Sequence, residues 1–249
     1  MAVRKVSSSL ITNPVKQNNI SADTIIATGG TITSYTDSDG VQYRVHTFTG
    51  TGTFTITNGS ANIDYLCIAA GGGRVGEWSG GGGAGGMLEG SFQGAIGSYT
   101  CTVGGGNTAA NGSNSSISGP TISVTAIGGG RGGGRFSPQR GNSGGSGGGS
   151  AQGQTGPLGW GPQGHRGADS GGLSHSTGGG GRNAQGNSTT GGSGRASYIT
   201  GAWVTYARGG DGAFGGTFYD TAGLGNGAKG QNGGTGPGNS GVVILRYKA

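Results

Sequence analysis

Short alternations of apolar and polar residues fill the first 70 positions of the chain. In residues 41–48, Val, Tyr, Val and Thr alternate with Gln, Arg, His and Phe, and Phe54 and Ile56 continue the alternation after a glycine turn. Neighbouring stretches, TIIATGG, TITSYT and TFTIT, are rich in Thr and Ile and are separated by turn residues such as TDSDG. This patterning is typical of β-strands. It predicts a small antiparallel sheet with one buried face.

Beyond position 70 the pattern changes to short glycine runs. Residues 71–241 hold 61 of the 67 glycines, and the runs keep no fixed period, which excludes a collagen triple helix. Disorder is one interpretation of such a composition. Against it stand the interleaved apolar stretches SYTCTV, PTISVTAI, RASYITGAWVTYAR and the closing SGVVILRY, which are strand-like.

An ordered alternative is a lattice of extended glycine segments. A polyproline-II chain has about three residues per turn, rises about 3.1 Å per residue and makes no internal hydrogen bonds. Its N–H and C=O groups therefore need lateral partners, which neighbouring glycine segments can approach closely enough to supply. Glycine contributes no apolar side chain, and only 10% of residues are charged, so the composition argues against an ordinary globular core and against coiled coils.

These observations predict a mainly β and irregular fold with almost no α-helix. An N-terminal β segment precedes a glycine-rich domain of packed polyglycine-II helices flanked by β-strands. We divide the chain into residues 1–40, an attachment or oligomerisation segment, residues 41–70, a small β region, and residues 71–249, the glycine-rich domain with exposed loops.

The order of several motifs resembles a known family. YRVHTFTGTGTFTITNGSANIDYLCIAAGGG, GGGGAGGM, SYTCTVGGGN, TAIGGGRGGG, GGSGGGS and GNSGVVILRY resemble the glycine-rich domain of bacteriophage tail-fibre and host-recognition proteins, over roughly residues 41–249. The resemblance implies a virion protein, made in the host cytoplasm, whose glycine helices pack into a sandwich and whose end loops touch the bacterial surface. Residues 1–40 depart from this pattern.

Binding residues are expected where side chains reappear between the glycine runs. Aromatic rings offer a flat apolar face, and arginine offers a forked donor to acidic groups. For some aromatics the alternative is a plug over the end of the glycine lattice, and this is the favoured interpretation for Trp203 and Tyr206. The candidate receptor-binding residues are Trp78, Arg135, Phe136, Arg140, Trp160, His165, Arg166, Trp203, Tyr206, Phe218 and Tyr219.

Catalytic, metal and cofactor sites are not expected. The nine acidic residues are scattered, and no nucleophile elbow is present. Gly225–Gly230 fits a dinucleotide-binding pattern only by chance at this glycine density, and Asp37–Gly40 is interpreted as a hairpin turn rather than a calcium loop. Cys67 and Cys101 lie in apolar stretches and are expected to be reduced core thiols.

The expected function is attachment of a phage to its host, without catalysis. Expected partners are other tail proteins, through residues 1–40, and a bacterial surface glycan or outer-membrane protein; a homotrimer, or a monomeric tip on a trimeric fibre, is expected. The formal net charge of +6 is compatible with an acidic surface. Alternatives are a purely structural virion component and, from GGGRGGGRF, an RGG-like RNA-binding segment.

Overall fold

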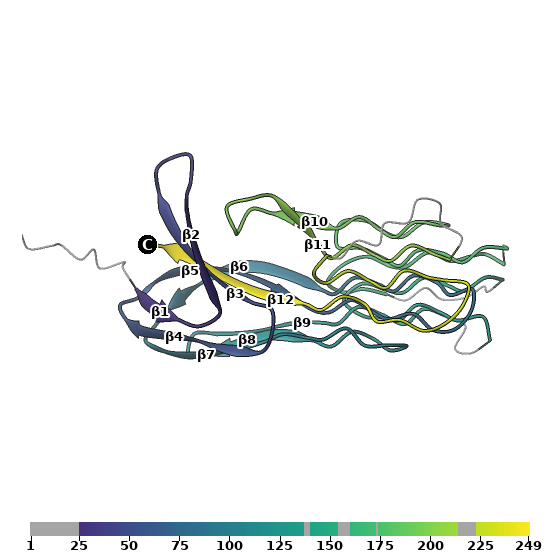
Figure 1. Ribbon diagram of the computed structural model, residues 1–249, viewed down its shortest axis with the longest axis horizontal. Coiled ribbons are helices and arrows are strands. Elements are labelled where there is room, and N and C mark those ends of the chain that lie inside the picture. Colours follow the sequence, from purple (N-terminus) through teal and green to yellow (C-terminus); the bar gives the residue numbers. More distant parts are fainter. Residues whose placement is uncertain (1–24, 137–139, 154–159, 173, 214–222) are drawn as a thin grey trace, which may run out of the picture.

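The computed structural model describes residues 25–136, 140–153, 160–172, 174–213 and 223–249. Over these residues the chain is all β, without a helix, as the sequence predicts. The molecule is elongated: β-sheets form one half, and long irregular segments run side by side in the other half (Figure 1).

Two five-stranded antiparallel sheets form the first half. In spatial order the first sheet contains β1 (Ile26–Thr28), β4 (Gly52–Asn58), β7 (Gly97–Thr102), β8 (Ser115–Gly119) and β9 (Ile122–Ala126). The second contains β2 (Thr31–Thr36), β3 (Gln42–Phe48), β12 (Val242–Lys248), β5 (Ala61–Ile68) and β6 (Met87–Gly94). A separate hairpin is formed by β10 (Arg195–Ser197) and β11 (Val204–Tyr206).

A side-chain core fills the space between the two sheets. Phe54, Tyr99 and Ile117 from the first sheet pack in one cluster with Ile63 and Leu245 from the second. The expectation that the composition excludes an ordinary core is therefore wrong for this half of the molecule. The apolar residues are concentrated in the strands, so an average over the whole chain understates how much apolar surface one region can bury.

The second sheet is covered on both faces. Val45 and His46 are neighbours on β3 and point to opposite faces, yet both are fully buried. The outer face, on the Val45 side, packs against Ala84 and against Tyr206 and Ala207 at the end of the β10–β11 hairpin. The predicted single buried face is thus corrected to two, because a hairpin from a distant part of the chain folds over this sheet.

The glycine segments form a lattice with a three-residue period. Its central segment is residues 79–86. Its N–H groups donate to three neighbouring segments in turn. Gly80 and Gly83 donate to Gly133 and Gly130 of the first, and Gly81 and Ala84 donate to Thr177 and Gly180 of the second. Gly82 and Gly85 donate to Ala228 and Gly225 of the third. Each neighbour is thus contacted at every third residue, which is the repeat of a polyproline-II helix.

Three further segments donate to carbonyl oxygens of the same central segment. Gly72 donates to Gly83, Gly149 donates to Gly81, and Gly210 donates to Gly82, with donor to acceptor distances of 2.8–2.9 Å. Residues 79–86 are therefore surrounded by six neighbouring segments within the described part of the chain. The cohesion of this half comes from backbone hydrogen bonds, each of which contributes about 0.5–1.5 kcal/mol net.

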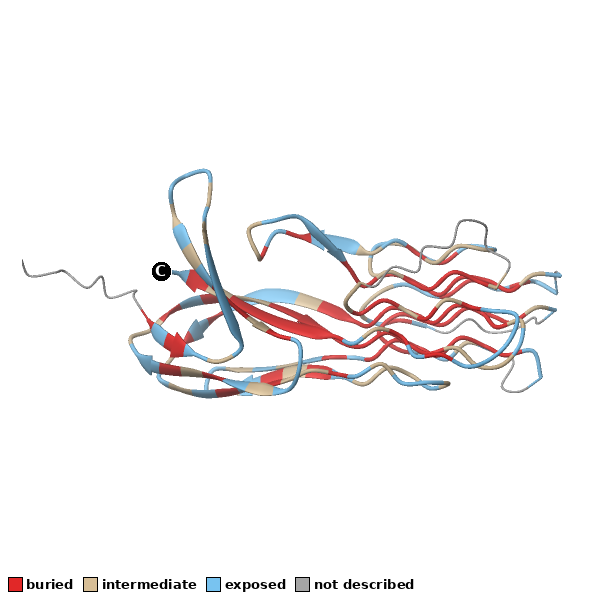
Figure 2. Cartoon of the chain, in the orientation of Figure 1, coloured by how far each residue is buried: buried red, intermediate tan, exposed pale blue. Residues whose placement is uncertain are grey.

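Close packing explains why the lattice requires glycine. A Cβ atom built on Gly82 would overlap the carbonyl oxygen of Gly72, and one on Gly129 would overlap that of Gly83. Ala84 is the one residue of 80–86 with a side chain, and that side chain belongs to the apolar cluster on the outer face of the second sheet. Figure 2 shows the buried backbone running along the centre of the lattice.

The composition change near Gly71 does not separate the sandwich from the lattice. Strands β6 to β9 lie beyond that position and belong to the sandwich, as does β12, which lies between β3 and β5. Strands β1 and β2, from the predicted attachment segment, each form the edge of one sheet. The chain thus leaves the sandwich as glycine segments and returns to it repeatedly.

Candidate functional site

Side chains gather in the loops at the end of the lattice farthest from the sandwich. Residues 79–86 lead from the loop 74–78 to strand β6, and at about 3.1 Å per residue they span roughly 25 Å. The neighbouring segment 128–134 runs antiparallel to it, from β9 to Arg135, because Gly83 donates to Gly130 and Gly80 to Gly133. Trp78 and Arg135 therefore reach the same far end, called the tip below.

Three candidates from the sequence meet at the tip. The guanidinium carbon of Arg135 lies 5.9 Å from the ring centre of Trp78 and 5.5 Å from that of Phe136. The Phe136 side chain is 72% exposed, and Trp78 is half-buried. The arrangement presents aromatic surface beside a cation, which suits contact with a sugar ring, a protein side chain or an acidic group.

Backbone hydrogen bonds hold this Trp78–Arg135–Phe136 cluster. The Arg135 N–H donates to the Glu77 carbonyl over 3.1 Å, and the Gln152 N–H donates to the Trp78 carbonyl over 3.3 Å. Trp78 has a φ of +50°, a left-handed conformation that non-glycine residues seldom adopt. Adjacent loops thus fix the tryptophan, although its backbone conformation is costly.

The other candidates are spread over the molecule. Arg140 is exposed in the loop that follows Phe136. Trp160 is 60% exposed, but its backbone bonds to Ser143 and Gly144 on the flank of the lattice. His165 and Arg166 are also exposed on this flank, in the segment whose carbonyls accept from Gly147 and Gly186.

Two candidates belong to the hairpin over the sandwich, far from the tip. Trp203 is 74% exposed and lies against Tyr198, with ring centres 5.4 Å apart. Tyr206 is only 3% exposed and packs in the apolar cluster on the outer face of the second sheet, so it is corrected from a receptor contact to a core residue. Phe218 and Tyr219 lie outside the described residues.

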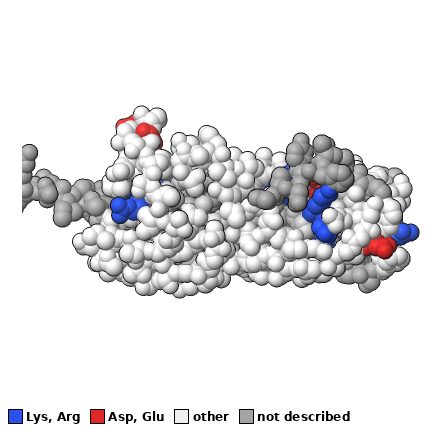
Figure 3. Space-filling model, viewed as in Figure 1, with Lys and Arg blue, Asp and Glu red and all other residues white. Residues whose placement is uncertain are grey.

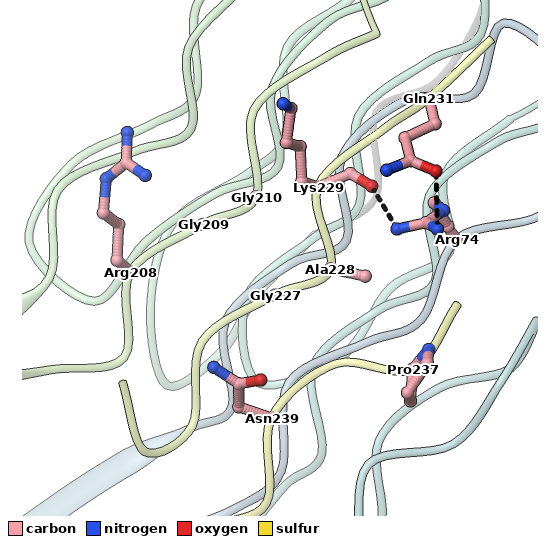
Figure 4. A pocket seen from close by; sticks show the side chains of 10 residues that line it. All are labelled: Arg74, Arg208, Gly209, Gly210, Gly227, Ala228, Lys229, Gln231, Pro237 and Asn239. Carbon is pink, nitrogen blue, oxygen red and sulfur yellow. Dashed lines mark hydrogen bonds between the residues drawn. The ribbon is translucent and has the colours of Figure 1, made fainter. Parts of the chain in front are cut away.

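A cationic pocket opens in the side of the lattice. It encloses about 270 Å³ and is lined by Arg74, Arg208 and Lys229 together with Gln231 and Asn239 (Figure 4). Arg74 donates to the Lys229 carbonyl over 3.1 Å and to Oε1 of Gln231 over 2.8 Å. Three cationic side chains around one hollow suit a small anionic group.

A carboxylate partly balances the pocket. Asp211 is buried, forms a 2.8 Å ion pair with Arg208 and accepts a hydrogen bond from the Gly191 N–H. This pocket has no signature in the sequence, because its lining residues come from segments that are distant in the sequence. Figure 3 shows how few charged side chains this face carries; they lie over the β2–β3 hairpin and the glycine-rich half.

Other sequence motifs have structural roles. Arg131 of the GGGRGGGRF stretch is 5% exposed, and it donates to the Gly132 carbonyl and to Oδ1 of Asn142. Residues 225–230 form a lattice segment, and no helix lies in the described residues 223–249. Cys67 and Cys101 are free and buried, as expected, and burial raises the pKa of each thiol to about 12.

Neither a metal cluster nor a membrane-spanning helix is found in the described residues. Within them no group of three or more His, Cys, Asp or Glu side chains is placed to hold a metal ion. The same part of the chain has no helix long and apolar enough to cross a membrane.

Comparison with known proteins gives one match. No curated protein and no solved structure matches the chain. A protein family described as a glycine-rich domain matches residues 46–248, which include strands β4 to β12, the end of β3 and the whole lattice. The chain belongs to this glycine-rich domain family.

Proposed function

We propose that the chain is a bacteriophage tail-fibre or adhesin protein that attaches the virion to the bacterial surface without catalysis. The observation that carries the proposal is the Trp78–Arg135–Phe136 cluster at the tip of a rigid glycine lattice. Binding residues are commonly found on loops held by a rigid scaffold. In this protein the scaffold carries almost no side chains of its own, so recognition falls to the loops.

The molecule has two distinct ends. The first described residue, Ile25, packs in the core of the sandwich, and the C-terminal strand β12 also lies in the sandwich (Figure 1). The tip points away from both. This polarity suits a protein that docks on other tail proteins through residues 1–40 and presents its opposite end to the host.

The contact chemistry favours an exposed aromatic anchor beside a cation. Aromatic and arginine residues are enriched in protein interfaces and dominate their binding energies. The cationic pocket around Arg74 and Lys229 adds a place for an acidic group of a surface glycan. RNA binding is less favoured, because Arg131 is buried.

The test uses the full chain labelled with a fluorophore and a panel of intact bacterial strains. We expect saturable binding to at least one strain, and we expect Phe136→Ser and Arg135→Gln each to weaken it about tenfold or more, as loss of an interface anchor does. Trp203→Ser is the matched control. It removes an aromatic side chain of nearly equal exposure from the opposite half of the molecule, and binding should be retained.

Pretreatment of the cells separates the two receptor classes. Loss of binding after periodate oxidation identifies a glycan, and loss after protease treatment identifies an outer-membrane protein. Absence of binding to every strain, or equal binding by Phe136→Ser and the unaltered chain, would refute attachment through the tip. A structural role in the virion would then be the better hypothesis.

A further inference from the structure

Among the described residues, strand β2 has a partner on one side only. It is the edge of the second sheet and pairs with β3 through six consecutive residue pairs, from Thr31 opposite Thr47 to Thr36 opposite Gln42. Five of its six residues are exposed, and Tyr35 is half-buried. An edge strand presents a row of N–H and C=O groups that can pair with another extended chain.

This edge lacks the usual protection against pairing. Its sequence, TITSYT, contains no charge, proline or glycine, and its register with β3 is regular. The other edges differ: β1 has only three residues and a register shift, the Gln163 side chain donates to the Thr125 carbonyl of edge strand β9, and β6 carries Glu89, which pairs with Arg195. Soluble proteins normally blunt a regular edge of this length, and an unblunted one indicates a partner.

The edge is also accessible. Figure 1 shows the β2–β3 hairpin rising from the body of the sandwich, and Figure 2 shows β2 exposed along its length. Strand β3 also pairs with β12, from Tyr43 to Phe48, so β2 is held by a strand that lies inside the sheet. Ile32, which is 46% exposed, adds apolar surface that a neighbour would cover.

We propose that β2 pairs antiparallel with β2 of a second copy of this chain, forming a twofold dimer with a continuous ten-stranded sheet. Twofold antiparallel pairing places one residue of the strand opposite its own copy. In β2 every such choice brings together uncharged side chains, so no like charges meet. Threonine pairs across antiparallel strands are themselves favourable.

The pairing closes after two copies. A twofold contact uses the same patch on both partners and leaves no free β2 edge for a third. A trimer or an open filament would instead need a second, different surface complementary to β2. The oligomeric state therefore separates this proposal from a threefold assembly, whether or not the tip binds bacteria.

Charge substitutions at Thr33, near the middle of the strand, test the pairing. In the dimer Thr33 lies opposite its own copy or close to it, so Thr33→Lys and Thr33→Glu each bring like charges together. We expect the unaltered full chain to be a dimer by light scattering after size exclusion, and each variant to be a monomer. An equimolar mixture of the two variants should recover a dimer, because opposite charges then meet.

Thr100→Lys is the matched control, because Thr100 is exposed on β7, a strand with partners on both sides. It should remain a dimer, and all three variants should still unfold cooperatively, which shows that each one is folded. A trimer, a dimer that survives Thr33→Lys, or no recovery on mixing would overturn the proposal. A native chain that is monomeric at its highest soluble concentration would also overturn the proposal. This includes a monomer in which residues 1–24 of the same chain protect the β2 amides from hydrogen exchange.

Discussion

At the residue scale, the lattice depends on the absence of a Cβ atom at each glycine. Most glycines of residues 71–86 have a neighbouring carbonyl oxygen where a Cβ would stand. In an ordinary core a wrong side chain displaces other side chains, which can change rotamer. Here it would displace a backbone carbonyl that is already hydrogen-bonded, and the neighbouring segment would have to move as a whole.

Gly82→Ala should therefore destabilise the protein strongly. The added methyl group meets the Gly72 carbonyl inside van der Waals contact, and we expect a loss at or above the upper end of the usual range for overpacking, about 3 kcal/mol. Chemical denaturation measures it. Gly105→Ala is the matched control, because its Cβ would meet nothing within 4 Å. Equal stabilities for the two variants would contradict the close-packed lattice.

Burial of His46 predicts a pH dependence of stability. Its Nδ1 lies 2.7 Å from the Gly29 carbonyl and its Nε2 lies 3.2 Å from the Tyr247 hydroxyl. Burial, with a smaller contribution from Arg44, lowers the pKa of His46 below its ordinary value of 6.5. As the pH falls through 6.5, the unfolded chain therefore takes up a proton before the folded one, and the free energy of unfolding decreases.

The measurement is the melting temperature between about pH 7.5 and pH 5.5, above the range in which carboxylates titrate. His46→Gln should be less stable than the native chain at neutral pH but should show a flatter dependence on pH. An unchanged slope in this variant would assign the dependence to other groups.

At the element scale, the last strand completes the sandwich. Strand β12 lies between β3 and β5, and Val243 and Leu245 from it enter the core between the sheets. Its other face contributes Val242 and Ile244 to the outer cluster. The second sheet therefore cannot form until the chain has traversed the whole lattice, and such non-local pairing favours slow folding.

Deletion of residues 242–249 should abolish cooperative unfolding. Without β12, strands β3 and β5 lose their common partner, and both apolar clusters lose buried side chains. Calorimetry of the truncated chain would show no heat-absorption peak, whereas removal of Ala249 alone should change little because that residue is exposed. A truncated chain that still melts cooperatively would show that the lattice folds without the sandwich sheet.

At the whole-molecule scale, two kinds of cohesion are joined end to end. Side-chain burial holds the sandwich, and lateral backbone hydrogen bonds hold the lattice. Segments cross the junction without a linker, for example from β5 through Ala69 and Ala70 into the glycine run 71–73. The tip, where the proposed contact lies, and the β2 edge proposed for pairing are in opposite halves of the molecule.

Much of the fold could be predicted from local patterns. Alternation in residues 41–48 and in the closing SGVVILRY marks strands β3 and β12, and the glycine runs mark the lattice, because each signal depends only on neighbouring residues. The division of β1 to β4 between two sheets was not predictable. Gly29 and Gly30, both with positive φ, turn the chain from one sheet to the other, and local sequence does not record that direction.

The candidate site was predicted only in part. Exposed aromatics beside arginine identified Trp78, Arg135 and Phe136, but the same rule selected Tyr206, which is buried by a sheet distant in sequence. The cationic pocket had no sequence signal, since Arg74 and Lys229 meet only because their segments are neighbours in the lattice.

The sequence by itself determined the kind of cohesion: a chain with 67 glycines and few charges must bond through its backbone wherever side chains are missing. Only the tertiary structure decided which segments became neighbours, because glycine runs are nearly alike and carry no side chains to specify a partner. The sandwich determines which glycine segments become neighbours. Its strands fix where each glycine segment begins and ends, and the tip and the β2 edge follow from that arrangement.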